Sequence, residues 1–136
     1  MPYRDYTGKA VLVTGGTMGI GLSTGLAFAR RGAHVYLTNK WGTADEDAVL
    51  EQFRRERLTA PEIIRADVAS SDDTAALLRE IHSRHDGIEA FISNVAVALV
   101  IRGLEDYTEQ SLFKSIDYSA WPMVEHTRRI REEFGR

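Results

Sequence analysis

Residues 9–21 of the 136-residue chain, KAVLVTGGTMGIG, decide the fold. Residues 9–14 are a short apolar run that is typical of a buried strand, and a helical pattern begins at Gly19. Gly15 permits a tight turn off the strand, Gly19 permits close approach of the backbone to a pyrophosphate, and Gly21 permits close packing of the helix on the sheet. The stretch therefore predicts a strand–turn–helix unit whose helix N-terminus binds phosphate, with a plain glycine turn as the alternative.

The rest of the chain repeats this alternation of strand and helix. Apolar runs predict three further strands, at residues 33–38, 62–66 and 88–93. Helical patterns lie between and after these strands, at residues 43–58, 71–86, 108–120 and 122–134. The order βαβαβαβα predicts an α/β fold with a doubly wound parallel sheet, a Rossmann fold with helices on both faces. We interpret residues 1–136 as a single domain of this type.

Local signals predict where the helices begin and end. Thr43 is expected to cap the second helix, and Ser71 or Asp72 the third. Gly32 is expected to close the first helix, and Pro122 predicts a kink or a new helix start. The last helix is expected to bury one apolar face: Val124, Ile130 and Phe134.

Composition narrows the class of protein. Hydrophobic residues make up 43% of the chain, which is enough for a core, and a net charge of −3 offers no broad basic surface for nucleic acid. There is no cysteine, so disulfides and thiolate metal sites are excluded. His82 and His85 could share a metal ion on one helix, but a solvated helix end is the preferred interpretation, and no metal site is predicted. The longest apolar run, residues 95–101, is too short to cross a membrane, so the expected location is the cytoplasm.

The glycine spacing points to a particular family. Three residues separate Gly15 from Gly19, one separates Gly19 from Gly21, and Thr14 precedes them. This pattern resembles the short-chain dehydrogenase/reductase family. Residues 93–96, SNVA, share Asn94 with the Asn-Asn-Ala-Gly of most members. The small-apolar-Ala ending, together with residues 116–119, IDYS, is similar to the enoyl-thioester reductase branch.

The resemblance implies a nicotinamide cofactor. The family places an acidic residue after the third strand against the adenine amine, and Asp67–Val68 stands at that position. After the second strand the chain offers Asn39 and Lys40, with no carboxylate before Asp45. A lysine can pair with the 2′-phosphate of NADP, so NADP(H) is favoured over NAD(H), although lysines after strands are also common as structural residues. The expected cofactor-binding residues are Gly15, Thr17, Met18, Gly19, Ile20, Gly21, Asn39, Lys40, Asp67, Val68 and Asn94.

The same resemblance implies an oxidoreductase that reduces a carbonyl or an activated carbon–carbon double bond, including one carried on a thioester. The family's proton chemistry uses a Tyr with a Lys four residues later. None of the five tyrosines has that lysine, and neither Tyr107 nor Tyr118 is expected to have a lysine placed to activate it. The family's Asn in the helix before the fifth strand would fall near Asp117, whose ionised carboxylate can only accept hydrogen bonds.

The chain is therefore expected to be inactive by itself and to stop before the fifth strand of the fold. The fourth strand would then present an open edge, with Phe91, Ile92, Leu99 and Val100 facing water. The expected partners are the remainder of the same protein or a second chain, as in a homo-oligomer, and a small-molecule or thioester-linked substrate. The alternative is a nucleotide-binding or interaction module without catalysis.

Overall fold

The computed structural model describes residues 4–41 and 45–135 and contains one parallel four-stranded sheet. The strands are β1 (Ala10–Thr14), β2 (His34–Asn39), β3 (Glu62–Arg65) and β4 (Ile88–Ser93), in the spatial order β3-β2-β1-β4. All three pairings are parallel. The order reverses between β1 and β4, so the predicted doubly wound α/β arrangement is confirmed, and the reversal marks the point where such sheets bind ligands.

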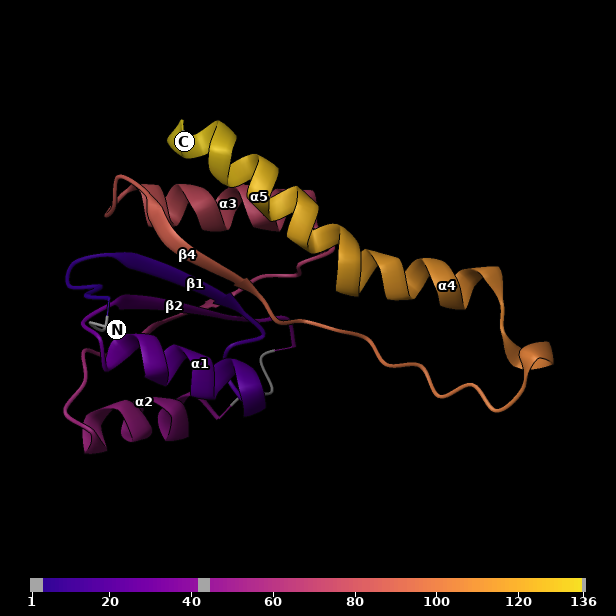
Figure 1. Ribbon diagram of the computed structural model, residues 1–136, viewed down its shortest axis with the longest axis horizontal. Helices are drawn as coiled ribbons and strands as arrows, with labels where there is room; N and C mark the ends of the chain where they lie inside the picture. Colours follow the sequence, from indigo (N-terminus) through magenta and orange to yellow (C-terminus); the bar gives the residue numbers. More distant parts are fainter. Residues whose placement is uncertain (1–3, 42–44, 136) are drawn as a thin grey trace.

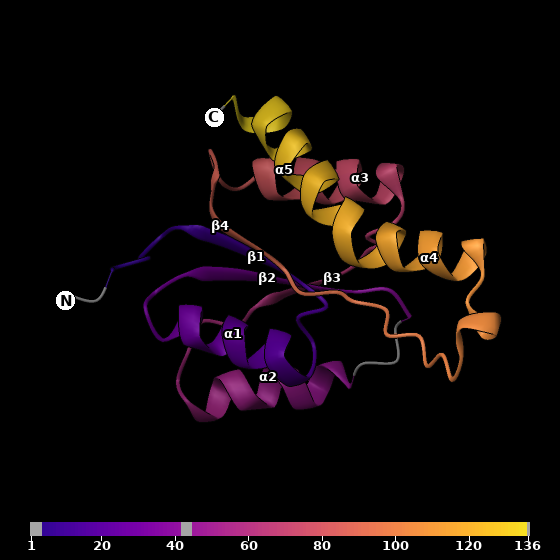
Figure 2. The ribbon, with the colours of Figure 1, turned by 45° about the vertical axis from the view of Figure 1, so that its right-hand side comes forward.

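Helices cover both faces of the sheet (Figure 1). On one face lie α1 (Gly19–Ala29) and α2 (Glu46–Arg55), and on the other lie α3 (Ser71–His82) and α5 (Trp121–Phe134). The turned view keeps this arrangement, with the sheet between the two helical layers (Figure 2). Two short helices, η1 (Leu104–Asp106) and α4 (Glu109–Ser115), extend beyond the carboxyl ends of the strands.

Two apolar layers hold the helices on the sheet. Alternate residues of a strand point to opposite faces, so β1 sends Val11 and Val13 to the side of α1 and α2, and Leu12 to the side of α3. Phe53 of α2 and Ile81 of α3 are fully buried in these two layers. Because helices cover both faces, every residue of β1 is buried, which is why the strand reads as a continuous apolar run.

Two of the predicted helix caps are corrected. Thr43 lies outside the described residues, and α2 is capped by Asp45, whose carboxylate accepts a hydrogen bond from the Ala48 amide at 3.0 Å. The cap of α3 is Ser70, whose hydroxyl accepts from the Asp73 amide at 3.2 Å. Ser70 has extended backbone angles, as an N-cap requires, so Ser71 already belongs to the first turn.

The start of α5 confirms the effect of Pro122. A π-helical turn, η2 (Ile116–Ala120), ends where α5 begins, and Pro122 lies in the first turn of α5. Ile130 and Phe134 pack against the apolar layer beside α3, as predicted. Val124 does not, because 54% of it is exposed. The first half of α5 instead buries Glu125 and His126, and the His126 ring stacks on Phe91 at 5.2 Å.

The open edge of the sheet is partly as expected. β4 pairs with β1 and has no second strand partner among the described residues. Val100 is 92% exposed and Leu99 is also exposed, but Phe91 and Ile92 pack against the two apolar layers, so the prediction for these two residues is wrong. The reason is that α5 covers one side of β4, and the core around α1 covers the other.

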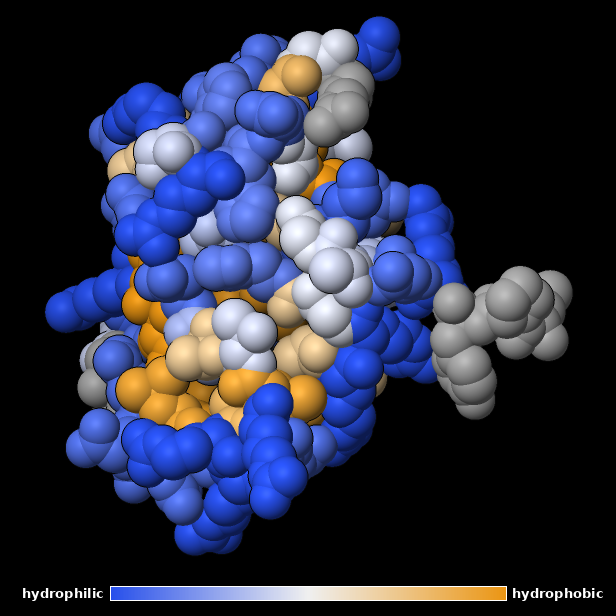
Figure 3. All heavy atoms as spheres, turned by 90° about the vertical axis from the view of Figure 1, so that its left-hand side faces the viewer, coloured by the Kyte–Doolittle hydropathy of each residue, from blue (hydrophilic) through white to orange (hydrophobic). Residues whose placement is uncertain are grey.

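The opposite end of the molecule, at the amino ends of the strands, is mainly hydrophilic, with apolar side chains gathered in its lower half (Figure 3). His82 and His85 contact different residues: His82 Nδ1 lies 2.8 Å from Glu133 Oε1, whereas the centre of the His85 ring lies 4.9 Å from that of His34.

Within the described residues, no helix is long and apolar enough to cross a membrane.

Candidate cofactor site

The turn from β1 into α1 forms an open cradle. Gly15 and Gly19 adopt left-handed backbone angles, with φ of +61° and +54°. A Cβ atom on Gly19 would meet no atom within 4 Å, whereas one on Gly21 would lie 2.2 Å from the Gly15 carbonyl oxygen. Gly19 thus leaves space above the helix end, and Gly21 lets the helix lie directly under the turn.

No side chain of its own first turn offsets the partial positive charge at the N-terminus of α1. No side chain caps the helix at Met18, and its first turn carries no acidic residue. The amide groups of the first turn of a helix have no partner within the helix and carry a partial positive charge. An anion placed above Gly19 would therefore meet backbone donors and no competing carboxylate from the first turn.

Asn94 fixes the end of β4 to this cradle. Its side-chain amide donates to the Gly15 carbonyl at 3.0 Å, and its backbone amide donates to the Thr14 hydroxyl at 3.2 Å. The two strand ends on either side of the sheet reversal are thus joined by hydrogen bonds. Asn94 shapes the cradle and also lines it.

Two hollows run along the carboxyl ends of the strands. The larger, about 650 Å³, lies over the cradle between α1 and α2, and we call it the cradle hollow. The smaller, about 300 Å³, lies beside it over the ends of β2 and β3, and we call it the side hollow. The two hollows share six lining residues, which makes them one crevice: Gly15, Asn39, Lys40, Trp41, Val95 and Ala96.

The structure brings nine of the eleven expected cofactor-binding residues to this crevice. Gly15, Thr17, Met18, Gly19, Asn39, Lys40 and Asn94 line the cradle hollow, and Asp67 and Val68 line the side hollow. The other two do not line it: Ile20 points outward with 80% of its surface exposed, and Gly21 lies under the turn.

Lys40 stands at the centre of the crevice, surrounded by three residues. Its ammonium lies 2.7 Å from Asp67 Oδ2 and donates to the Tyr118 hydroxyl. The same nitrogen lies 4.4 Å from the centre of the Trp41 ring and 4.6 Å from that of Tyr118. The hydrogen bond to Asp67, followed by that to Tyr118, raises the pKa of Lys40, so the side chain carries its positive charge. We call Lys40, Trp41, Asp67 and Tyr118 the lysine clamp.

Two polar residues, Thr38 and Asp67, form part of the wall of the side hollow. Asp67 Oδ1 accepts from the Ala69 amide at 3.0 Å, so its carboxylate is held at the rim by two different donors. The Thr38 hydroxyl is buried in the wall and has no hydrogen-bond partner among the described residues.

Tyr118 contacts a lysine that lies far away in the sequence. No lysine follows it at the fourth position, yet Lys40, 78 residues earlier in the chain, bonds its hydroxyl. Asp117, expected near a catalytic position, is exposed and is not among the described residues that line the two hollows. Its neighbours face inward instead: Tyr118 lines the side hollow, and Ser119 Oγ accepts from the Val97 amide at 3.0 Å. A π-helical turn is invisible to a pattern of period 3.6, so spacing alone could not have selected Tyr118.

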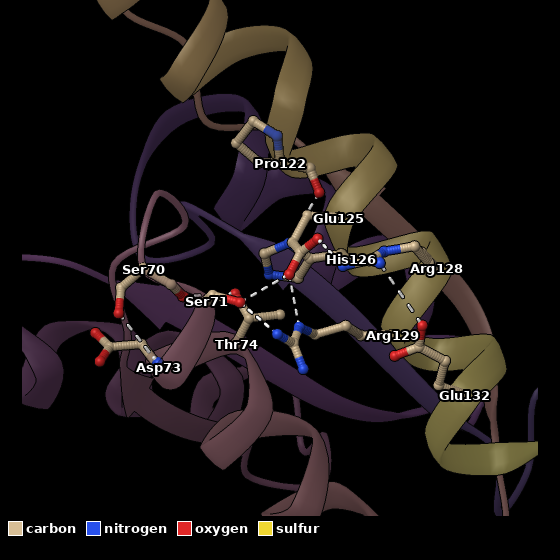
Figure 4. Close-up of polar contacts among 10 residues, drawn as sticks. All are labelled: Ser70, Ser71, Asp73, Thr74, Pro122, Glu125, His126, Arg128, Arg129 and Glu132. Carbon is tan, nitrogen blue, oxygen red and sulfur yellow. Dashed lines mark hydrogen bonds and ion pairs between the residues drawn. The ribbon is translucent and has the colours of Figure 1, made fainter.

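A second polar cluster lies between α3 and α5, away from the crevice (Figure 4). Glu125 is 4% exposed, and its carboxylate accepts from Arg129 Nε at 2.6 Å, from the Ser71 hydroxyl at 2.9 Å and from Arg128 at 2.9 Å. These donors, Arg129 foremost, lower the pKa of Glu125 to about 2. The cluster fixes α5 on α3 and so supports the helical segment that carries Tyr118.

Comparison with known proteins gives one consistent family. The sequence model described as short chain dehydrogenase matches residues 9–135. Glucose and ribitol dehydrogenase from Daucus carota is 29% identical over 140 residues, which cover 97% of this chain and 48% of that protein.

Solved structures agree with this result. The NADH-dependent reductase A1-R' complexed with NAD superimposes with a TM-score of 0.82 at 27% identity, over 94% of this chain and 52% of that one. A short chain dehydrogenase from Burkholderia cenocepacia in complex with NADP gives a TM-score of 0.81 at 20% identity, over 95% of this chain and 52% of that one. The chain thus spans about half the length of these relatives.

Proposed function

Because the chain belongs to the short chain dehydrogenase family, we propose that it is the cofactor-binding part of an NADP(H)-dependent oxidoreductase. The observation that carries this proposal is the open cradle at Gly19, where a Cβ atom would meet nothing within 4 Å. A pyrophosphate above it would accept hydrogen bonds from the first amides of α1 and would be favoured by the helix dipole.

The side hollow would hold the adenosine end of the cofactor. Its volume of about 300 Å³ suits a flat ring, and its walls are apolar at Ala66 and Val68. Asp67 lies at the rim, where its carboxylate could accept from the adenine amine.

Lys40 supports the choice of NADP(H) over NAD(H). An ammonium has three N–H donors, and Asp67 and Tyr118 use two of them. The third is available to the 2′-phosphate of NADP(H), and Asn39, at the same end of β2, lines the crevice without adding negative charge. The family includes proteins that use either cofactor, since the reductase A1-R' is NADH-dependent.

The proposed reaction is reduction of a carbonyl or of an activated carbon–carbon double bond, with thioesters among the substrates. The cofactor, when bound, supplies the hydride. This chain would bind the phosphates through α1, orient the adenosine through the side hollow, and shape the cradle with Asn94. The name of the carrot relative, which is a glucose and ribitol dehydrogenase, favours the carbonyl class over the enoyl class.

A non-catalytic nucleotide-binding or interaction module is the second candidate. It is favoured by the location of Tyr118 and its lysine, which meet at the adenosine end of the crevice and not where hydride would be transferred. The partner in either case would cover the edge of β4 and the exposed side chains of α4 and α5. We propose the remainder of the same protein or a second copy as that partner.

Replacing Lys40 tests the proposal. In Lys40→Ala, affinity for NADPH should fall at least tenfold more than affinity for NADH, because a charge-assisted contact is worth about 1.5–3 kcal/mol. Isothermal titration calorimetry with both cofactors measures this. Lys9→Ala removes an exposed lysine before β1, at the other end of the strand, and should change neither affinity. Equal losses for both cofactors in Lys40→Ala would reject NADP(H), and failure of the parent to bind either would reject the nucleotide site.

Turnover tests the reaction class. The protein should be assayed by NADPH absorbance with three substrate groups: aldehydes and ketones, enones, and enoyl thioesters. Binding of NADPH without turnover in any group would favour the non-catalytic candidate.

A further inference from the structure

We infer that Tyr118 is a positioning residue for cofactor discrimination, because it holds the Lys40 ammonium where the 2′-phosphate of NADP(H) would meet it. This inference rests on the proposed function and goes beyond it, because Tyr118 lies on a different element from the strand ends that read the ribose. Tyr118 acts through Lys40 and not by touching the reacting atoms.

The geometry of the lysine clamp supports this role. A lysine side chain is a flexible stem with a compact charge, so its ammonium is fixed only where acceptors surround it. Asp67 offers one acceptor at 2.7 Å and Tyr118 offers another, while the Trp41 and Tyr118 rings lie 4.4 and 4.6 Å from the nitrogen. Asp67 alone would draw the ammonium into an ion pair and offset its charge. A neutral hydroxyl on a second element shares the ammonium without adding negative charge.

The backbone around Tyr118 fits a specialised role. The π-helical turn Ile116–Ala120 lies between α4 and α5, and such turns are rare and occur often at functional sites. Ser119 in the same turn accepts a hydrogen bond from the Val97 amide, and Val97 lines the side hollow together with Tyr118. The turn is thus fixed to the wall of the hollow, and Tyr118 reaches Lys40 from a defined place.

The charges around the side hollow favour an anionic ligand. Lys114, on α4, also lines the hollow, so two lysines and one carboxylate surround it. These three groups sum to a net charge of +1, which attracts a phosphate and neutralises one of its two negative charges. A pre-positioned ammonium loses less conformational freedom when the phosphate arrives, and that saving appears as affinity for the phosphorylated cofactor alone.

The test compares two probes that differ only in the 2′-phosphate: adenosine 2′,5′-bisphosphate and 5′-AMP. The ratio of their dissociation constants, measured by isothermal titration calorimetry, reports discrimination. In Tyr118→Phe the preference for the bisphosphate should fall about fivefold, equivalent to one net hydrogen bond of about 1 kcal/mol. Affinity for 5′-AMP should change less than about twofold, which corresponds to about 0.4 kcal/mol. Tyr118→Leu also removes the ring beside the ammonium and should reduce the preference further.

Tyr107→Phe is the matched control, because it removes the hydroxyl of a tyrosine that does not line the side hollow, and it should leave the ratio unchanged. Far-ultraviolet circular dichroism and the thermal midpoint establish that each variant is folded. An unchanged or increased preference in the Tyr118 variants, or an equal loss for both probes, would overturn the inference and leave the nucleotide site in place. A parent protein that binds neither probe would instead overturn the proposed function and this inference together.

Discussion

At the scale of single residues, the glycines of the cradle carry different constraints. Gly19 needs a positive φ and opens onto free space, whereas Gly21 has an ordinary φ and lies 2.2 Å, at its Cβ position, from the Gly15 carbonyl. We propose that the open space at Gly19 serves a ligand, whereas Gly21 serves packing of the helix under the turn. A larger residue at Gly19 should therefore reduce ligand binding without crowding the fold, whereas a larger residue at Gly21 should crowd the fold itself.

Gly19→Val should abolish measurable binding of NADPH, because the side chain would occupy the space above the first amides of α1. The substitution also strains the backbone by about 1–2 kcal/mol, since φ is positive. Gly8→Val is the matched control: Gly8 has a φ of +71° and no atom within 4 Å of its Cβ position, but it does not line the crevice. We expect the two variants to have similar thermal midpoints and only Gly19→Val to lose NADPH binding. Equal binding in both variants would show that the phosphate does not lie at this turn.

At the scale of elements, α5 is held on α3 by charge as well as by apolar packing. Glu125 has its pKa lowered to about 2 from an ordinary value of 4.5. A carboxyl group with a lowered pKa in the folded state adds stability above its ordinary pKa, and that stability is lost as the pH falls towards 2. The window of the effect is therefore between about pH 4.5 and pH 2.

Glu125→Gln should lower the free energy of unfolding at pH 7 by up to about 3 kcal/mol, and the difference from the parent should shrink as the pH falls through that window. Urea unfolding of both proteins at a series of pH values measures it. Glu56→Gln is the control: Glu56 pairs with Arg30 on the surface, so its loss should be smaller because water screens the pair. A pH-independent difference for Glu125→Gln would mean that packing, not charge, joins α5 to α3.

At the scale of the whole molecule, the sheet has two edge strands, β3 and β4. β4 has no second strand partner among the described residues. The helical segment α4–η2–α5 exposes five apolar side chains: Leu112, Phe113, Ile116, Met123 and Val124. A groove of about 720 Å³ runs between β4 and α5. Exposed strand edges and apolar patches of this kind favour association with further polypeptide.

Residues 1–136 expressed alone should bind NADPH but should not reduce a carbonyl by the family's usual proton transfer. Lys40 bonds the hydroxyl of Tyr118, but this pair lies in the side hollow, which we propose for the adenosine end of the cofactor. Sedimentation and a turnover assay check this, and we expect an associated species without measurable reduction. A stable monomer that reduces a substrate at an ordinary enzyme rate would show that the chain contains its own acid.

The sequence by itself determined the sheet, the cradle and most of the crevice. Strand period, helix period and glycine spacing are local properties, so residues 9–21 predicted β1, the turn and α1. The end of the second strand predicted Asn39 and Lys40, and the resemblance to the family predicted Asp67 and Asn94. Parallel strands end at one edge of a sheet, which is why residues far apart in sequence could be assigned to one crevice before the fold was known.

Only the tertiary structure decided which side chains meet. Tyr118 and Lys40 are 78 residues apart, and their contact depends on a π-helical turn and on the docking of α5 through the buried Glu125. The burial of Phe91 depends on the same helix, because its ring stacks on His126. Such contacts follow from the angle and depth at which helices pack on the sheet, and no local pattern encodes these quantities, since they are set by the whole core at once.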